Sequence, residues 1–223
     1  MMKLKPIDKA EAARYMGIRG EADSAVSAIL ERWEPIVREK LRPAYVYREA
    51  QVEFTGEGVR ISGMAEPLTG KDIRRHLEGC KRAVLLAATA SAEADKLIRQ
   101  AQVSGMAEAL AVDCLCSAAI EQICSRAEEE IFSRTQAPYR TWRFSPGYGD
   151  LPISLQKPFL EALNAGRRIG LTVTESSLLV PSKSVTAIIG IAEEELTGRG
   201  KSGCESCNMR DRCAFSSNGR CKR

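Results

Sequence analysis

The residues best suited to hold a ligand lie in one short segment, RFSPGYGD, which begins at Arg143. A guanidinium carries a planar set of N–H donors that can hold both oxygens of a carboxylate. Pro146 fixes one backbone angle of the turn that follows, and Gly147 lets the backbone approach a ligand closely. Tyr148 adds a flat ring for stacking or for contact with a cation. The pattern predicts a site for a small ligand with a carboxylate. A strand-end arginine in an ordinary salt bridge is the alternative.

A second polar cluster, Thr174-Glu175-Ser176, follows within β-rich sequence. A carboxylate at Glu175 could hold an amine, a ribose hydroxyl or a sulfonium, and Ser176 adds a hydroxyl. A solvated turn or a helix cap is the alternative. The run LVPSKSV then sets polar residues from Pro181 to Ser184 between two apolar segments, either as a loop that lines the ligand or as a plain connection.

Four of the eight cysteines fall within the last 20 residues, spaced C-x2-C-x5-C-x7-C: Cys204, Cys207, Cys213 and Cys221. Thiolates at such spacing can hold one zinc ion or an iron–sulfur cluster. In a cytosolic chain such a cluster more often binds metal than forms disulfides. A basic tail whose cysteines bind nothing is the alternative. The other four cysteines lie in apolar or helical sequence and are expected to be small buried side chains: Cys80, Cys114, Cys116 and Cys124.

Helices dominate the first two-thirds of the chain. Apolar spacing predicts helices over 8–16 and 23–41, the second kinked or interrupted at Pro35. The segment TGKDIRRHLEGC predicts a short helix with Thr69 as its N-cap, and Ser91 is a candidate cap for a helix over 91–102. The longest helical run, 106–132, contains neither Pro nor Gly.

Strand patterns fill the remainder. QVEFTGEGVRISG alternates apolar and polar residues around Gly56-Glu57-Gly58, which predicts a hairpin, and AYVYREA before it could pair alongside. Further strands are expected over 83–88, 139–144, 170–174 and 185–191, and a helix over 154–164. We expect an α+β fold with a mixed, largely antiparallel twisted sheet flanked by helices. Residues 1–197 would form one domain that begins with the helices over 8–41, and 198–223 a Cys-rich tail.

Composition limits the functional classes. The chain carries a net charge of +4, but residues 199–223 hold seven Lys/Arg and two Asp/Glu, so the rest sums to −1. A general nucleic-acid surface would place basic residues on the body as well. No apolar run approaches the roughly 20 residues that a membrane span needs. The N-terminus has no signal-like apolar core, so we expect a cytoplasmic protein without a membrane partner.

Several of these motifs together resemble the activation domain of cobalamin-dependent methionine synthase. The family carries Arg-x-x-Pro-Gly-Tyr, which Arg143, Pro146, Gly147 and Tyr148 match. It also carries a Leu-Thr-Glu-Ser stretch and a Pro-x-x-Ser-Val strand, matched from Thr174 to Val185, with Val173 in place of the leucine. The segments YMGIRG, GKDIRRHLEGCKRAVLLAAT and AVDCLCSAAIEQICSRAEEEI are similar to stand-alone bacterial versions. The resemblance covers roughly residues 10–192.

The resemblance implies a chain that binds S-adenosylmethionine and supports reductive methylation of cob(II)alamin. Arg143 would hold the methionyl carboxylate, Ser145, Pro146 and Gly147 would meet the adenosine, and Tyr148, Glu175 and Ser176 would complete the pocket. The chain would be non-catalytic by itself or a subunit of a methyltransferase system, and it would position the methyl donor. Partners would be a cobalamin-binding methionine synthase or related corrinoid protein and a flavodoxin- or ferredoxin-like electron donor.

Some family features are missing from this sequence. A corrinoid domain would carry Asp-x-His-x-x-Gly, but Arg74 replaces the Asp before His76, which is expected at a helix surface. The aromatic pair that longer members carry after the last strand is replaced by AEEELTGRG. Glu121 and Glu128 are expected on a solvated acidic face, with a corrinoid-facing role as the alternative. A metal- or nucleic-acid-binding module that uses the basic tail is the second hypothesis, and a methyltransferase with its own acceptor is the third.

Overall fold

The computed structural model describes residues 2–135 and 138–196, so the predicted Cys-rich tail over 198–223 lies outside the described residues. A five-stranded sheet in the order β2-β1-β3-β7-β4 forms the centre, with every pair antiparallel. Its strands are β1 (Ala44–Phe54), β2 (Val59–Ile61), β3 (Arg82–Thr89), β4 (Tyr139–Arg140) and β7 (Ser184–Ala192). A separate two-stranded sheet pairs β5 (Thr172–Val173) with β6 (Leu179–Val180). This arrangement confirms the α+β, largely antiparallel fold class.

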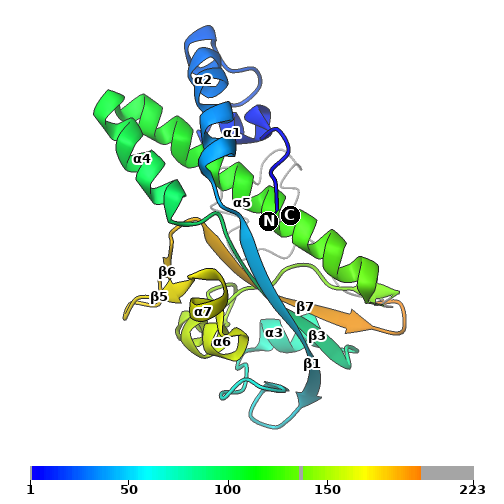
Figure 1. Ribbon diagram of the computed structural model, residues 1–223. Helices are drawn as coiled ribbons and strands as arrows, with labels where there is room; N and C mark the ends of the chain where they lie inside the picture. The colour runs from blue at the N-terminus through cyan, green and yellow to red at the C-terminus, as the bar shows by residue number, and fades with distance from the viewer. Residues whose placement is uncertain (1, 136–137, 197–223) are drawn as a thin grey trace.

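Strands β3 and β7 are apolar along their length because helices cover both faces of the sheet (Figure 1). Val84 and Leu86 pack with Ile189 on the face that α5 covers. Leu85 and Ile188 belong to the core on the opposite face. The segment AYVYREA and the first strand of the predicted hairpin form one continuous strand, β1, which ends at Phe54 and pairs with β2.

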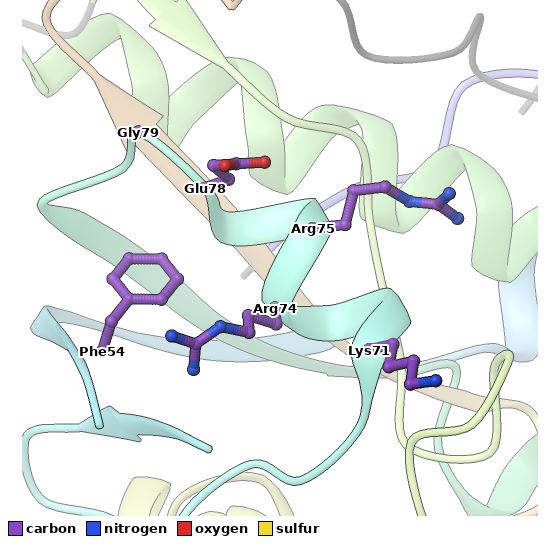
Figure 2. A pocket seen from close by; sticks show the side chains of 6 residues that line it. All are labelled: Phe54, Lys71, Arg74, Arg75, Glu78 and Gly79. Carbon is purple, nitrogen blue, oxygen red and sulfur yellow. The ribbon is translucent and has the colours of Figure 1, made fainter. Parts of the chain in front are cut away.

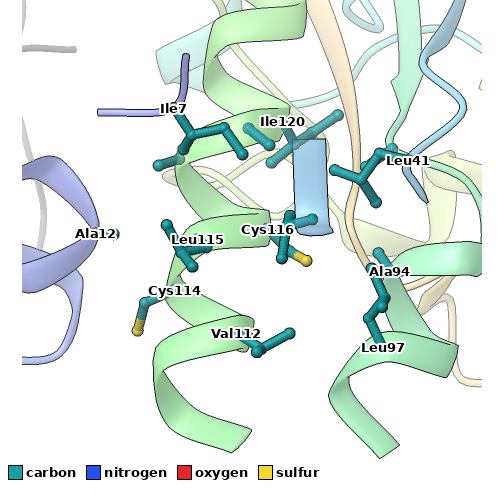
Figure 3. Close-up of a cluster of buried hydrophobic side chains, with 14 of the residues drawn as sticks. Ile7, Ala12, Leu41, Ala94, Leu97, Val112, Cys114, Leu115, Cys116 and Ile120 are labelled. Carbon is teal, nitrogen blue, oxygen red and sulfur yellow. The ribbon is translucent and has the colours of Figure 1, made fainter. Parts of the chain in front are cut away.

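A helical layer covers one face of the sheet. The long helix α5 (Met106–Arg134) packs with α1 (Lys9–Tyr15), α2 (Ser24–Lys40) and α4 (Ala92–Ser104), and the shared core is shown in Figure 3. Asp8, Asp23 and Ser91 cap α1, α2 and α4 through their side chains, as the sequence predicts for Ser91. The prediction that Pro35 interrupts its helix is wrong in part. The helix α2 runs on to Lys40, and Pro35 lies exposed on its surface.

Shorter helices cover the other face. They are α3 (Lys71–Leu77), the 3₁₀ turn Ile153–Leu155, α6 (Gln156–Leu163) and α7 (Ala165–Ile169), and Figure 1 shows them opposite α5. The prediction that Thr69 caps α3 is wrong. Gly70 occupies the cap position without a side-chain bond, and the carboxylate of Asp150, distant in sequence, accepts from the N–H groups of Lys71 and Asp72 at 2.6 and 3.0 Å.

None of the helices in the described part of the chain is both long and apolar enough to cross a membrane. The four cysteines of the body are buried, as predicted: Cys80, Cys114, Cys116 and Cys124. Desolvation raises the pKa of the Cys116 thiol to about 12, which is typical of a structural rather than a reactive cysteine.

Candidate functional site

The segment that carries Arg143 continues from β4 along the same edge of β7. Thr141 N donates to Gly190 O at 3.0 Å, and Phe144 and Ile188 exchange two backbone bonds at 3.1 and 2.7 Å. Trp142 and Arg143 therefore lie opposite the single residue Ile189. One extra residue on one strand of an antiparallel pair is a β-bulge, which redirects the side chains beside it.

The bulge decides which way Arg143 points. In a regular strand, Thr141 and Arg143 would share a face and Phe144 would lie on the other. Here Thr141 contacts His76 of α3, and Phe144 belongs to the core on the same side. Arg143 is left on the opposite side, against α5. The bulge thus places the side chain of Arg143 on the opposite face of the sheet from the side chains that precede and follow it.

On that side Arg143 lies between two carboxylates of α5. Its Nη2 is 2.9 Å from Glu121 Oε2, and its Nε is 2.8 Å from Glu128 Oε1. The two glutamates are seven residues apart, so two turns of helix place them on one face. The prediction that they form a solvated acidic face is wrong, because both pair with Arg143 and the side chain of Glu128 is only 17% exposed.

Burial and charge act in opposite directions in this cluster. Burial lowers the pKa of the Arg143 guanidinium, but the neighbouring Glu121, Cys124 and Glu128 outweigh it and raise that pKa above its usual value. Burial also raises the pKa of Glu128, and Arg143 and Arg140 offset only part of the rise. Arg143 therefore stays charged in a partly desolvated place, which favours contact with an anionic group.

The Pro-Gly-Tyr turn forms directly after Arg143. Tyr148 N donates to Ser145 O at 2.9 Å, and Gly147 N donates to Leu151 O at 2.9 Å. Gly147 has φ +95°, a conformation that favours glycine. Ser145 and Pro146 are buried, and Ser145 Oγ donates to Thr186 O of β7. Tyr148 is 40% exposed, and its ring lies at a steep angle to that of Phe144, with 6.0 Å between the ring centroids.

Glu175 and Ser176 lie on a different element from Arg143. They form the exposed turn of the β5–β6 hairpin, where Thr174 N donates to Leu178 O and Thr174 Oγ1 lies 2.9 Å from Ser176 Oγ. The strand end predicted before them is present. The structure thus brings Arg143, Ser145, Pro146, Gly147 and Tyr148 together in one segment and holds Glu175 and Ser176 on the separate small sheet.

The run from Pro181 to Ser184 is anchored to the same helical layer as Arg143. Lys183 Nζ lies 2.8 Å from Asp113 Oδ1 and 3.0 Å from Ser117 Oγ of α5. Ser182 binds the carboxylate of Asp95 on α4. Two cations, Lys183 and Arg143, therefore connect the sheet to one face of α5.

His76 lies in a place that the sequence does not indicate. It is 3% exposed, so the prediction of a helix-surface position is wrong. Its Nε2 is 2.8 Å from Thr141 Oγ1, and its ring contacts those of Trp142 and Phe144. The buried side of α3 therefore touches the segment that carries Arg143.

The exposed side of α3 borders a hollow of about 520 Å³ (Figure 2). Arg74 stacks over Phe54 there, with 5.4 Å between guanidinium carbon and ring centroid, and Lys71 and Arg75 lie beside it. None of the predicted ligand residues lines this hollow. Among the described residues, no group of His, Cys, Asp or Glu could hold a metal ion.

Comparison with known proteins identifies the fold and the family. The described fold is similar to the crystal structure of the MetH reactivation domain bound to AdoHcy, with a TM-score of 0.59 and 15% identity over 85% of this chain and 75% of that one. Among curated proteins, none matches the chain. The family model of the vitamin B12 dependent methionine synthase activation domain matches residues 79–196, more than half of the chain and the part that contains Arg143 and the Pro-Gly-Tyr turn. The chain therefore belongs to the methionine synthase activation domain family.

Proposed function

We propose that the chain binds S-adenosylmethionine at the Arg143–Tyr148 segment and presents its methyl group to a corrinoid on a partner protein. Membership of the family supports this role, and the similar MetH reactivation domain is bound to AdoHcy, the demethylated form of that ligand. When bound, S-adenosylmethionine supplies the methyl group that reductive methylation of cob(II)alamin requires. The contribution of the chain is to hold and orient the donor.

The observation that carries the proposal is the placement of Arg143 between Glu121 and Glu128. The amino-acid end of S-adenosylmethionine is a zwitterion, with a carboxylate and an ammonium on one carbon. A guanidinium beside a carboxylate matches that pair, because the first can bind the carboxylate and the second the ammonium. Arg143 is 21% exposed and is therefore reachable from solvent.

Glu121 and Glu128 differ in how readily they can exchange partners. The side chain of Glu121 is 43% exposed and can turn toward a ligand ammonium at little desolvation cost. Glu128 is more enclosed, and it would keep Arg143 Nε fixed while Nη2 transfers to the ligand carboxylate. Tyr148, on the turn that follows, would place its exposed ring against the adenosine or the sulfonium.

Glu175 and Ser176 complete the proposed pocket from the β5–β6 hairpin. Their turn is exposed and carries a carboxylate and hydroxyl groups, which suit a ribose. The partners would be a cobalamin-binding methionine synthase or related corrinoid protein and a flavodoxin- or ferredoxin-like electron donor. The chain itself would carry out no bond-making step.

Calorimetric titration with S-adenosylmethionine tests the proposal. We expect wild type to bind and Arg143→Ala to bind at least about tenfold more weakly, since a charged hydrogen bond contributes about 1.5–3 kcal/mol. Arg134→Ala is the matched control, because Arg134 also pairs with a carboxylate of α5, Glu130 at 2.8 Å. No binding by wild type would exclude the function, and equal losses in the two variants would exclude a specific role for Arg143.

We propose in addition that the four tail cysteines, Cys204, Cys207, Cys213 and Cys221, hold one metal centre, either zinc or an iron–sulfur cluster. Their spacing in the sequence is the basis. We expect anaerobically purified and reconstituted protein to contain iron with sulfide, or else one zinc, and Cys204→Ser/Cys207→Ser to lose it. Metal analysis that finds neither element in wild type would contradict this proposal without bearing on ligand binding at Arg143.

A further inference from the structure

Helix α3 contacts the ligand segment at its far end, beyond Tyr148. The carboxylate of Asp150 accepts from the N–H groups of Lys71 and Asp72 at the start of α3. The backbone comes so close here that a Cβ on Gly149 would lie 2.2 Å from Asp72 Oδ2, and Gly149 has φ +54°. Backbone bonds to the first N–H groups of a helix fix a carboxylate firmly. The end of the Pro-Gly-Tyr turn is therefore attached to α3.

The same helix contacts the near end of the segment, just before Arg143. Thr141 Oγ1 lies 2.8 Å from His76 Nε2 and accepts from Gly190 N of β7 at 2.7 Å. Thr141 is 5% exposed and His76 is 3% exposed, so water does not compete for these bonds. The His76 ring also lies 4.9 Å from the ring centroids of both Trp142 and Phe144.

These contacts hold the bulge in register. Thr141 is bound to α3 and β7 at once, and Phe144 is packed on the same side of the sheet. Since Thr141 and Phe144 cannot both face α3 in a regular strand, the extra residue between them is required, and Arg143 must turn to α5. Loss of the Thr141 bonds would let the segment shift toward regular pairing, which moves Arg143 away from Glu121 and Glu128.

We propose that α3 is the positioning element of the ligand segment, with Thr141 and His76 as positioning residues on the Arg143 side and Asp150 on the Tyr148 side. None of the three needs to touch the ligand. They act by fixing the direction of Arg143 and the place of Tyr148 relative to α5. The inference rests on the proposed function only where ligand affinity is the measurement.

Paired substitutions separate positioning from general stability. Thr141→Val keeps the shape and removes the hydroxyl, whereas Thr141→Ser restores it. Asp150→Ala removes the cap, whereas Asp150→Asn retains an acceptor that caps helices well. Leu30→Ala is the control. Leu30 is buried in the helical layer on α2, so its loss lowers the melting temperature without touching α3 or the ligand segment.

Two measurements are made on each variant of the full chain. The first is the affinity for S-adenosylmethionine by calorimetry. We expect a loss of about tenfold or more in Thr141→Val, as for a buried hydrogen bond left unmade. The bonds of Asp150 are exposed, so we expect a loss of about fivefold in Asp150→Ala, as for the loss of a helix cap. Losses below about threefold are expected in the two conservative variants and in Leu30→Ala. The second is the Arg143 Nε–H resonance in ¹⁵N NMR, assigned by its loss in Arg143→Lys. It reports the bond to Glu128 and is expected to shift in Thr141→Val but not in Thr141→Ser or Leu30→Ala.

The outcomes are distinguishable. If wild type does not bind S-adenosylmethionine, the proposed function fails, and the NMR signal alone then decides the role of α3. An Arg143 resonance that is unchanged in Thr141→Val would overturn the inference. Equal affinity in Leu30→Ala and Thr141→Val at equal melting temperatures would overturn it as well. Should Thr141→Val not fold, the Asp150 pair provides the same comparison from the other end of the segment.

Discussion

At the scale of single residues, the candidate site depends on how the Arg143 guanidinium shares its ion pairs between two carboxylates. Arg143 reaches Glu121 and Glu128 at 2.9 and 2.8 Å, but Glu128 is the more buried of the two. A carboxylate that is partly desolvated resists ionisation, and its pairing with Arg143 does not fully offset that cost. The raised pKa of Glu128 should therefore be measurable through its effect on the free energy of unfolding.

Glu128→Gln should reveal this in the pH dependence of unfolding. Burial raises the pKa of Glu128 in the folded state, whereas in the unfolded chain a glutamate titrates near about 4.3. The folded state thus binds the proton more readily, so this group contributes stability at low pH that is lost as pH rises through the folded-state pKa. The free energy of unfolding of wild type minus that of Glu128→Gln should be larger at pH 4 than at pH 7 in urea titrations. A difference that grows with pH would contradict the raised pKa.

The residues that sequence patterns identify are those whose chemistry is local. Arg143, Pro146, Gly147 and Tyr148 lie within six positions, and the last three do form a turn directly after Arg143. The partners of Arg143 could not be predicted, because Glu121 and Glu128 come from a helix that packs against it only in the folded chain. The buried position of His76 could not be predicted for the same reason. Its neighbours Arg74 and Arg75 suggest a solvated helix, yet His76 itself faces the sheet and is buried.

At the scale of elements, a close contact between the end of α3 and β7 constrains the site. Gly190 of β7 lies opposite Thr141, and a Cβ there would meet Cys80 Sγ at 2.6 Å, Leu77 Cδ2 at 3.1 Å and Thr141 Cγ2 at 3.2 Å. The glycine lets the end of α3 lie directly on the strand. This close approach brings His76 within reach of Thr141.

Gly190→Ala should therefore destabilise the protein through overpacking, by about 1–3 kcal/mol in the free energy of unfolding. Cys80→Ala removes the nearest atom, so the double variant should be more stable than the sum of the two single changes predicts, by about 0.5–3 kcal/mol. Chemical denaturation of the four proteins in the cycle measures this coupling. Strict additivity would show that Cys80 is not the atom that resists the methyl group.

Most elements follow from periodicity, but their connections do not. The helices over 8–41 and 106–132 and the hairpin around Gly56–Gly58 are where apolar spacing predicts them. The cap of α3 could not be predicted, because the capping residue, Asp150, is 79 positions from Lys71. The bulge at Trp142–Arg143 could not be predicted either, because a single extra residue changes no local sequence pattern. Only the pairing with β7 reveals it.

At the scale of the whole molecule, the sheet lies between two helical layers, and α5 belongs to two cores at once. Leu115 and Ile120 pack with α1, α2 and α4, whereas Ala127 and Ile131 pack on β3 and β7. The fold class could be predicted from the uneven order of helices and strands. The sharing of α5 could not, since its residues are apolar on more than one side. A helix common to two cores should make their unfolding a single cooperative event.

The two tryptophans allow a test of that cooperativity. Trp33 lies in the helical layer and is 7% exposed, whereas Trp142 lies in the bulge at the sheet edge, where its ring contacts that of His76. Trp142→Phe leaves a fluorescent reporter of the helical core, and Trp33→Phe leaves one of the sheet edge. Within each variant, the urea midpoint from fluorescence should agree with that from far-UV circular dichroism, because α5 cannot leave one core and keep the other. If Trp142 fluorescence changes at lower urea than the dichroism does, the sheet edge unfolds on its own. Arg143 would then be held by a segment that is less stable than the rest of the fold.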